Sequence, residues 1–410
     1  MTVNLSDIEA ARERLKGIAL STPIIADGRL TRELGADAHL KAECLQKSGS
    51  FKIRGAYNKI SQLSEEEKKR GVVAASAGNH AQGVALAASM LGIKSTIVLP
   101  EIAPLTKISS TRGFGGQVVL HGATFDEAVA YSRELQEREG YTYVHAFDDE
   151  QVLAGQGTIG LEIVEALPDI STVVVPIGGG GLISGIATAV KALKPDARVV
   201  GVQAKEAAWV NPSLKAGHAV KVEIGQTIAD GIAVKTPGEL TLPVIRELVD
   251  EVVEVSEEEI ARGIFFACQN NRLVTEGAGA AALGALLAKK VEVRPTGSVC
   301  VVLSGGNIDA NLLARVLEQV LVRQGRYIML KLLVPDRPGM LAALLNTVAE
   351  TRANVIEVFH RRAMWLAPLG RVGIEMLLEV RDNEHGREVQ KHLEEAGYHV
   401  EREGQGDWEA

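Results

Sequence analysis

The sequence predicts an α/β protein of two lobes, each a three-layer αβα sandwich, followed by a small ferredoxin-like βαββαβ domain. Over residues 70–145 and 150–320, continuous apolar segments that are typical of buried parallel strands alternate with helical segments. Near Gly325 the order changes, and strands and helices follow one another as βαββαβ within about 75 residues. These two patterns determine the fold class that we expect.

The first lobe is expected to follow an N-terminal amphipathic helix, which Ser6 or Asp7 can cap and Glu9 can complete as a capping box. A strand over residues 38–43 then leads into a loop that bears a lysine. Strand–helix units come next, as the change of hydrophobic period indicates. The expected strands span residues 72–75, 95–99, 117–120 and 141–144, and the expected helices residues 82–91 and 124–139.

The second block and the C-terminal region complete the expected domain organisation. We predict one domain over residues 1–322, with a smaller lobe (about 53–146) inserted in the larger lobe, and a second domain over residues 326–403. Residues 404–410 are expected to form a disordered tail. The remaining expected strands span residues 172–177, 198–203, 299–303, 327–334, 354–361, 371–380 and 398–403, and the helices residues 182–193, 340–351 and 383–396.

Composition excludes several classes of function. The 410 residues have a net charge of −8 and no basic stripe, so nucleic acid is not an expected partner. No apolar run of about 18 residues is present, and Met1 to Lys16 lacks the apolar core of a signal peptide, so we expect neither a membrane span nor secretion. The three cysteines lie far apart without C-x-x-C spacing, which fits a reducing cytoplasm.

A lysine in an unusual setting is the first candidate for chemistry. Lys52 follows Ser48-Gly49-Ser50-Phe51 and precedes the apolar period of a helix, so its amine is expected to point toward an interior. A desolvated amine is what Schiff-base chemistry requires. A partly buried lysine at a helix N-terminus is the structural alternative, and this motif alone does not exclude it.

Four consecutive glycines, Gly178, Gly179, Gly180 and Gly181, follow a buried strand and precede a helix. Backbone N–H groups at such a turn can converge on a phosphate, helped by the helix dipole. The dinucleotide pattern G-x-G-x-x-G is absent because Ile183 and Ser184 occupy the sixth positions, and no Gly-Lys-Ser/Thr follows. A tight strand–helix turn without a ligand is the alternative.

Two further loops end expected strands, where ligands bind in open α/β sheets. In Ser76-Ala77-Gly78-Asn79-His80, backbone N–H groups can bind a carboxylate and the Asn79 amide can bind a ring hydroxyl. In Ser304-Gly305-Gly306-Asn307, the Ser304 hydroxyl can contact a ring nitrogen. Each loop alone is also explained as a helix cap, and Glu276, in Thr275-Glu276-Gly277, is a weak candidate as a lone carboxylate.

Together these loops describe a ligand with a phosphate, a hydroxyl-bearing ring and an aldehyde. Over residue 5 to about residue 320, the chain resembles the pyridoxal-phosphate enzymes of fold type II (tryptophan-synthase β type), and among them the threonine dehydratases. The resemblance rests on four motifs: Ser50 to Ala56, Ala75 to Gly83, Gly178 to Leu182 and Ser304 to Asn307. The C-terminal region resembles an ACT regulatory domain, with Asp336-Arg337-Pro338-Gly339 as its first turn.

The resemblance implies a role for each candidate residue. Lys52 would form the Schiff base with pyridoxal 5'-phosphate, with Phe51 beside the cofactor. Asn79 would face the ring hydroxyl, Ser304 the ring nitrogen, and Gly178 to Gly181 with Leu182 the phosphate. The substrate carboxylate would be held by Ser76, Ala77, Gly78, Asn79 and His80. The implied activity is deaminating dehydration of L-threonine to 2-oxobutanoate and ammonia, and of L-serine to pyruvate.

Serine racemase/serine dehydratase and hydroxyaspartate ammonia-lyase are the alternatives within the same fold. Racemisation requires a second acid–base group on the face of the substrate opposite the lysine. By resemblance to the racemases, that group would be a serine immediately before the Gly-Asn of the asparagine loop. Here that position is Ala77, which cannot transfer a proton, so dehydration is favoured. Threonine and serine differ by one methyl group, worth only about 1–3 kcal/mol in an apolar pocket, so activity on both is expected.

The expectations for regulation, metal binding and assembly follow from the resemblance and from single residues. An RNA-binding ferredoxin-like domain is the alternative for the C-terminal region, but that region lacks the paired aromatic residues of such a sheet. By resemblance, isoleucine and valine are the expected effectors of the ACT domain. Glu206 lies at a strand end where some relatives bind a cation, but Val210-Asn211-Pro212 does not reproduce their ligands, so no specific metal is expected. A homodimer or homotetramer is the base-rate expectation.

Overall fold

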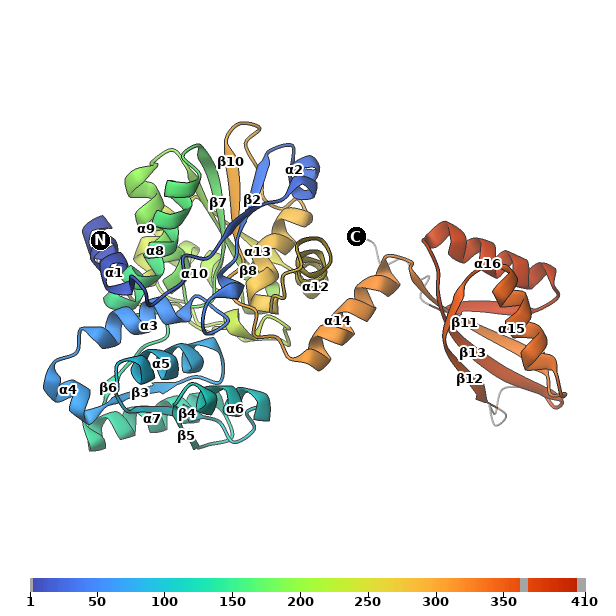
Figure 1. Cartoon of the computed structure of the whole chain (residues 1–410), viewed down its shortest axis with the longest axis horizontal. Coiled ribbons are helices and arrows are strands. Elements are labelled where there is room, and N and C mark those ends of the chain that lie inside the picture. The colour runs from blue at the N-terminus through green and yellow to red at the C-terminus, as the bar shows by residue number, and fades with distance from the viewer. Residues whose placement is uncertain (1–2, 362–367, 404–410) are drawn as a thin grey trace. The chain divides into compact units, whose positions relative to one another are not determined.

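The computed structural model describes residues 3–361 and 368–403, which form two compact units (Figure 1). The first unit ends at Asp309 and the second begins at Ala310, so helix α14 (Ala310–Arg323) belongs to the second. Our division of the sequence at residues 322–326 stays a prediction. Within the described residues, no helix has the length and apolarity needed to cross a membrane.

A six-stranded sheet forms the centre of the larger lobe, with strand order β1-β2-β10-β7-β8-β9. β1 is antiparallel to β2, and all other neighbours are parallel. In this register Cys300 lies between His39 and Val173. The strands are β1 (Ile24–Ala26), β2 (Asp37–Lys41), β7 (Ile170–Pro176), β8 (Arg198–Ala204), β9 (Glu251–Val255) and β10 (Ser298–Val302).

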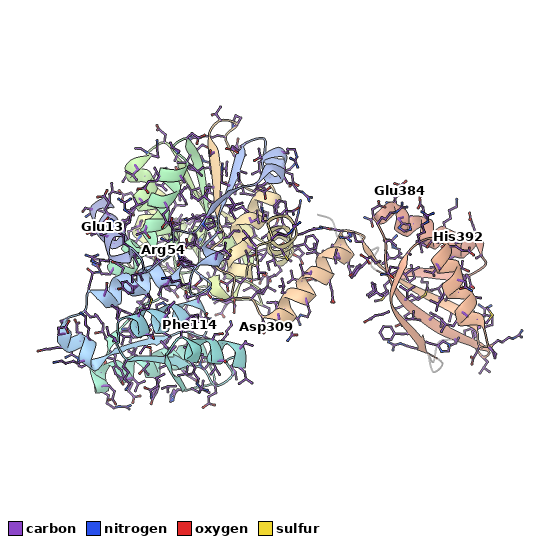
Figure 2. The ribbon with its side chains drawn as sticks, viewed as in Figure 1. Glu13, Arg54, Phe114, Asp309, Glu384 and His392 are labelled. Carbon is purple, nitrogen blue, oxygen red and sulfur yellow. The ribbon has the colours of Figure 1, made fainter. Side chains whose placement is uncertain are left out.

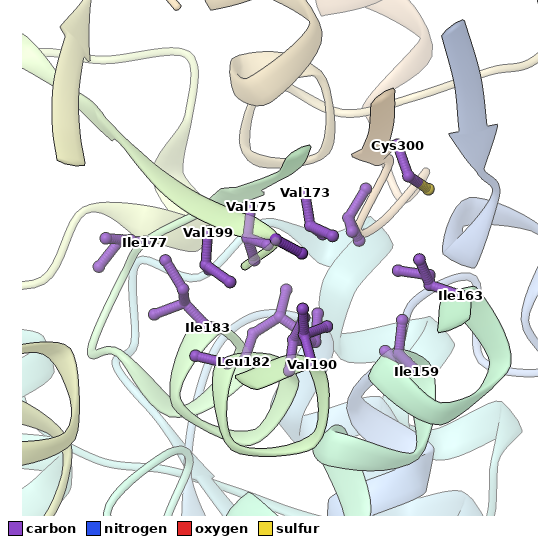
Figure 3. Close-up of a cluster of buried hydrophobic side chains, with 14 of the residues drawn as sticks. Ile159, Ile163, Val173, Val175, Ile177, Leu182, Ile183, Val190, Val199 and Cys300 are labelled. Carbon is purple, nitrogen blue, oxygen red and sulfur yellow. The ribbon is translucent and has the colours of Figure 1, made fainter. Parts of the chain in front are cut away.

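Helices cover the large sheet because its central strands are apolar on both faces. Side chains of α8 (Glu150–Ala166) and α9 (Gly181–Leu193) pack on β7, β8 and β10, and Figure 3 shows this cluster around Val173, Val175 and Ile183. The other helices of this lobe are α1 (Leu5–Leu15), α2 (Gly28–Leu34), α10 (Val210–Ala216), α11 (Thr241–Leu248), α12 (Glu257–Phe266) and α13 (Gly277–Leu287).

The smaller lobe is built on a parallel sheet with strand order β5-β4-β3-β6. Its strands are β3 (Val72–Ala75), β4 (Ser95–Leu99), β5 (Gln117–Leu120) and β6 (Thr142–Tyr143). Apolar side chains of α3 and α5 share one core with this sheet, while α7 shares a second cluster with β3 and β4. The helices are α3 (Lys52–Ser61), α4 (Glu65–Arg70), α5 (Asn79–Met90), α6 (Leu105–Gly113) and α7 (Phe125–Glu139).

The second unit contains an antiparallel sheet with strand order β12-β13-β11-β14. Buried and half-buried residues alternate along β11, as expected for a sheet that is covered on one face. The strands are β11 (Tyr327–Pro335), β12 (Asn354–Arg361), β13 (Arg371–Glu379) and β14 (His399–Glu403), and the helices α15 (Met340–Glu350) and α16 (Asn383–Glu395). The chain order is βαββαβ, the ferredoxin-like topology.

The predicted fold class is therefore confirmed, but the sequence did not predict two strands of the large sheet. β1 has three residues, and β9 (Glu-Val-Val-Glu-Val) is half-buried over most of its length. Both lie at the edges of the sheet, where one side is open and a continuous apolar run is not required. The expected disordered tail, residues 404–410, lies outside the described residues.

Candidate active site

The predicted loops follow strands whose carboxyl ends define the ligand-binding edge of each sheet. Ser76 comes directly after β3 in the smaller lobe. In the larger lobe the glycine loop follows β7, and Ser304 follows β10. Hydrogen bonds join the asparagine loop to the segments around Ser304, and Lys52 bonds to Ala146, which precedes the Phe147 that packs on the glycine loop.

Lys52 is the first residue of α3, and the end of β10 fixes the loop before it. Ser50 pairs with Gly305 as an isolated bridge, and the Phe51 N–H donates to the Ser304 carbonyl at 3.1 Å. The Lys52 Nζ donates to the Ala146 carbonyl at 2.8 Å. Desolvation lowers the pKa of Lys52 to about 8, although the nearby Glu276 carboxylate acts in the opposite direction. The neutral amine is therefore a minor form near physiological pH, but a far larger fraction than in an ordinary lysine.

Arg54 anchors the helix that begins with Lys52. Its side chain is buried in the interior of the first unit (Figure 2) and donates to Glu43 at 2.8 and 2.9 Å and to Glu162 at 2.6 and 3.0 Å. Lys41 also pairs with Glu162 and donates to the Thr22 carbonyl at 2.7 Å. Burial alone would raise the pKa of Glu43, but Arg54 reverses the effect and the pKa lies below its ordinary value. This buried network ties α3 to α8 and to the end of β2.

The glycine loop forms the N-terminus of α9 without any side-chain cap. Gly180 is the N-cap with φ +93°, a conformation that favours glycine. The Gly178 carbonyl accepts from Trp209 Nε1 and the Gly179 carbonyl from Thr241 Oγ1, both at 2.8 Å. Because no side chain caps this end of α9, the N–H groups of its first turn are available to an anion, as the prediction of a phosphate loop requires.

Phe147 closes the glycine loop on one side. A Cβ at Gly179 would overlap the Phe147 ring, and a Cβ at Gly181 would lie 2.9 Å from the Phe147 backbone. Phe147 follows Ala146, whose carbonyl accepts from Lys52. The segment after β6 therefore links the lysine to the predicted phosphate loop.

The asparagine loop is ordered by its own side chains. Ser76 Oγ accepts from the Gly78 N–H at 3.1 Å, and Asn79 begins α5. The buried His80 ring lies with Nε2 2.8 Å from the Val144 carbonyl. Desolvation, and then the charge of Lys52, lower the pKa of His80 to about 3, so the ring is neutral and bonded to the segment that follows β6. Any contact of His80 with substrate is therefore expected from its backbone, and its role stays a prediction.

Ser304 and Glu276 lie on the side of the site formed by β10 and α13. The Ser304 hydroxyl is buried, and its closest polar contact is the Ala278 carbonyl at 3.5 Å. Glu276 is 6% exposed, and its Oε1 accepts from Asn79 Nδ2. Asn307 Nδ2 donates to the other end of the same amide, Asn79 Oδ1, at 2.7 Å.

Sequence reasoning missed several residues that shape this site. In the sequence Glu276 is only a lone carboxylate, and its pairing with Asn79 spans 197 positions of the chain. Phe147, Trp209 and Thr241 lie in segments without a glycine-rich turn, so no local pattern indicated them. Asn307 is part of a strand-end motif, but nothing in its neighbourhood predicts that it contacts Asn79.

Comparison with known proteins agrees with this geometry. Residues 16–305 match the family model described as pyridoxal-phosphate-dependent enzyme. The L-threonine ammonia-lyase of Thermotoga maritima is 50% identical over 398 residues, which cover 97% of this chain and 99% of that protein. The chain belongs to the pyridoxal-phosphate-dependent enzyme family.

Two solved structures are similar to most of this chain. The processed form of threonine deaminase isoform 2 from Solanum lycopersicum has a TM-score of 0.73 and 41% identity, covering 78% of this chain and 87% of its own. Maize serine racemase has a TM-score of 0.74 and 34% identity, covering 79% of this chain and all of its own.

The residues present fit pyridoxal phosphate. The cofactor's aldehyde requires a neutral amine, which the lowered pKa of Lys52 provides. The uncapped α9 N-terminus fits its phosphate, and the Ser304 hydroxyl is free of any short protein hydrogen bond. Among the described residues, no group of three or more histidine, cysteine, aspartate and glutamate side chains is placed to hold a metal, and Glu206 is exposed.

Proposed function

We propose that this protein is a pyridoxal-phosphate-dependent threonine ammonia-lyase, which converts L-threonine to 2-oxobutanoate and ammonia. The similarity to the Thermotoga maritima L-threonine ammonia-lyase, 50% over nearly the whole of both chains, carries the proposal. The arrangement of Lys52, the glycine loop, Asn79 and Ser304 at the carboxyl ends of strands from the two lobes supports it.

Each part of the site has a task in this reaction. Bound pyridoxal phosphate supplies an electron sink for the charge that remains at the substrate Cα after loss of its proton. The N-terminus of α9 holds the phosphate, and the Asn79 amide and the Ser304 hydroxyl orient the ring. The backbone N–H groups of Ser76 to His80 bind the substrate carboxylate. With these roles, Lys52 would be the side chain that acts on the Cα–H bond.

Lys52 is the base of the reaction. The Lys52 amine, when it is not bonded to the cofactor, would remove the proton from Cα, and the β-hydroxyl would depart with a proton as water. One water molecule then hydrolyses the released enamine to 2-oxobutanoate and ammonia. The water that was eliminated is thus balanced by the water consumed. The pKa of about 8 keeps the Lys52 amine partly neutral, as a base requires.

Serine racemase is the second candidate, because the maize enzyme is similar over 79% of this chain. Racemisation requires a proton donor on the face of Cα opposite the lysine. Ala77 occupies the corresponding loop position here, and the His80 ring is bonded to the Val144 carbonyl. L-Serine is therefore a substrate for elimination to pyruvate, with threonine preferred.

We assign a regulatory role to the ferredoxin-like unit. Its topology and its Asp336 to Gly339 turn resemble ACT domains, and the alignment with the Thermotoga maritima enzyme extends through it. Isoleucine and valine are the proposed effectors, and a homodimer or homotetramer is the proposed assembly. We also place the protein in the cytoplasm, where its free cysteines stay reduced.

The test is to purify the protein with pyridoxal phosphate and to measure release of 2-oxobutanoate from L-threonine, together with the enantiomers of serine. We expect 2-oxobutanoate release, and ammonia from L-serine faster than D-serine appears. A protein that interconverts the serine enantiomers faster than it releases ammonia would be a racemase. A protein with neither activity would contradict the assignment to this reaction.

A further inference from the structure

Glu276 is a buried carboxylate to which no step of the proposed reaction gives a role. It is the N-cap residue of α13, but its side chain makes no capping hydrogen bond. Its Oε1 accepts from Asn79 Nδ2 instead, and its backbone N–H donates to the Gly305 carbonyl at 3.1 Å. A Cβ at Gly305 would overlap Oε1 and lie 3.0 Å from Asn79 Nδ2, so the glycine leaves space for this contact.

The same amide is bonded at its other end. Asn307 Nδ2 donates to Asn79 Oδ1 at 2.7 Å, and it also donates to the Ser48 carbonyl at 2.9 Å. A backbone carbonyl only accepts, so it fixes the orientation of Asn307. Asn307 in turn presents a donor, and the Glu276 carboxylate presents an acceptor. Turning the Asn79 amide over would place N–H against N–H and oxygen against carboxylate, so only one orientation is compatible with its neighbours.

We propose that Glu276 is a positioning residue, whose carboxylate holds the Asn79 amide in the orientation that binds the ring hydroxyl of the cofactor. This inference rests on the proposed function. An amide nitrogen has two hydrogens, and Glu276 takes one. The second hydrogen remains available for the cofactor. Its direction is set by the hydrogen bonds that run from the Ser48 carbonyl through Asn307 to Asn79.

The charges around Glu276 are consistent with a role at working pH. Burial raises the pKa of Glu276 to about 7, and the Asp230 carboxylate adds to the effect, while Asn79, Lys107 and Lys52 oppose it. Lys107 of α6 pairs with Asp230, so the two lobes both contribute charge near this group. As pH rises through about 7, the carboxylate forms, and its hydrogen bond to Asn79 becomes charge-assisted and stronger.

A double-mutant cycle tests the proposal through cofactor affinity, without measuring turnover. The dissociation constant of pyridoxal phosphate is measured for the wild type, Glu276→Ala, Asn79→Ala and the double variant, at a pH above 7. We expect Glu276→Ala to weaken binding about 10-fold, because a hydrogen bond to a charged group is lost. In the Asn79→Ala background the same change should have less than about twofold effect, because Glu276 acts through Asn79. Additive effects would overturn the proposal.

A conservative variant distinguishes a positioning role of Glu276 from an effect of its negative charge alone. It also provides a test if Glu276→Ala does not fold. Glu276→Gln keeps an oxygen that accepts from Asn79, so its cofactor affinity should stay within about threefold of wild type. A loss of about 10-fold or more in Glu276→Gln would overturn the positioning role. Glu259→Gln, which changes a carboxylate that caps α12 at Ser256, is the control and should leave cofactor affinity unchanged.

The outcomes distinguish this inference from the proposed function. A wild-type protein that binds no pyridoxal phosphate and releases no 2-oxobutanoate would overturn both. A wild-type protein that binds and reacts, but whose cycle is additive, would overturn only the role of Glu276.

Discussion

Lys52 differs from the exposed lysines of the chain in that its amine is desolvated and hydrogen-bonded to a backbone carbonyl. Desolvation lowers the pKa of Lys52, and the negative charge of Glu276 acts in the opposite direction. The pKa of Glu276 is itself raised to about 7. The ammonium form is therefore poorly compensated, which is why the pKa of Lys52 falls to about 8. This one property serves both the covalent attachment of the cofactor and the removal of the Cα proton.

The depressed pKa predicts how cofactor attachment depends on pH. Only the neutral amine attacks the aldehyde, so the rate of attachment to the apoenzyme should rise with pH. The midpoint should lie at about 8, the Lys52 pKa, rather than near the value of a free lysine. Stopped-flow absorbance after mixing apoenzyme with pyridoxal phosphate measures it. A midpoint near 10 would show that the amine is not desolvated.

Gly179 is the glycine whose replacement should affect the phosphate loop most directly, because an added Cβ would overlap the Phe147 ring. Gly179→Ala should weaken pyridoxal-phosphate binding about 10-fold or more, since overpacking costs about 1–3 kcal/mol. Gly113→Ala is the matched control, because a Cβ added at Gly113 would meet no atom within 4 Å. Equilibrium dialysis compares the two variants, and equal affinities would contradict this account of the loop.

At the scale of elements, the position of α3 decides where Lys52 points. The buried Arg54, Glu43 and Glu162 network joins α3 to α8, and the bridge between Ser50 and Gly305 joins the preceding loop to β10. The N-terminus of α9 and the start of α13 are held by the same large sheet. The chemistry is thus distributed over elements whose relative positions are fixed by buried polar contacts as well as by apolar packing.

Removing the centre of this network should destabilise the protein strongly. Arg54→Met leaves the buried Glu43 without its cationic partner and Glu162 with Lys41 alone, and breaking a buried pair in this way costs about 3–5 kcal/mol. The exposed pair of Arg12 and Glu165 offers the control, since Arg12→Met should cost about 1 kcal/mol or less. Urea unfolding followed by circular dichroism gives both values. Similar losses for the two variants would mean that the buried network contributes no more than a surface pair.

The sequence predicted local features of the site better than contacts between distant residues. Gly178 to Gly181 and the loop before Lys52 could be recognised because glycine and small residues mark a turn at a strand end. The pairing of Asn79 with Glu276 could not be predicted, because no local pattern indicates that the start of α13 lies against the asparagine loop. Edge strands β1 and β9 were missed for the related reason that half-exposed strands have weak periodicity.

At the scale of the molecule, a lyase unit is followed by a ferredoxin-like unit that makes no proposed contribution to the chemistry. On our proposal its function is to bind an amino-acid effector. Such a unit changes activity only if the effector binds two states of the enzyme with different affinity. Typical couplings of about 1–3 kcal/mol correspond to a roughly 5- to 150-fold change in affinity.

Isoleucine should therefore change the kinetics of the full chain. We expect it to shift the dependence of the rate on threonine concentration, and threonine to shift the affinity for isoleucine by the same factor, because linkage is reciprocal. Initial rates with and without isoleucine or valine, together with calorimetry, measure the two effects. Unchanged rates and no heat of binding for either amino acid would contradict the regulatory role.

We expect pyridoxal phosphate to be covalently attached to Lys52. Reduction of the holoenzyme with borohydride followed by peptide mass spectrometry tests it most directly, because reduction makes the bond to lysine permanent. The account predicts a single pyridoxyl group on the peptide that contains Lys52, and none in Lys52→Ala. Modification of a different lysine, or of the Lys52→Ala protein to the same extent, would contradict the account.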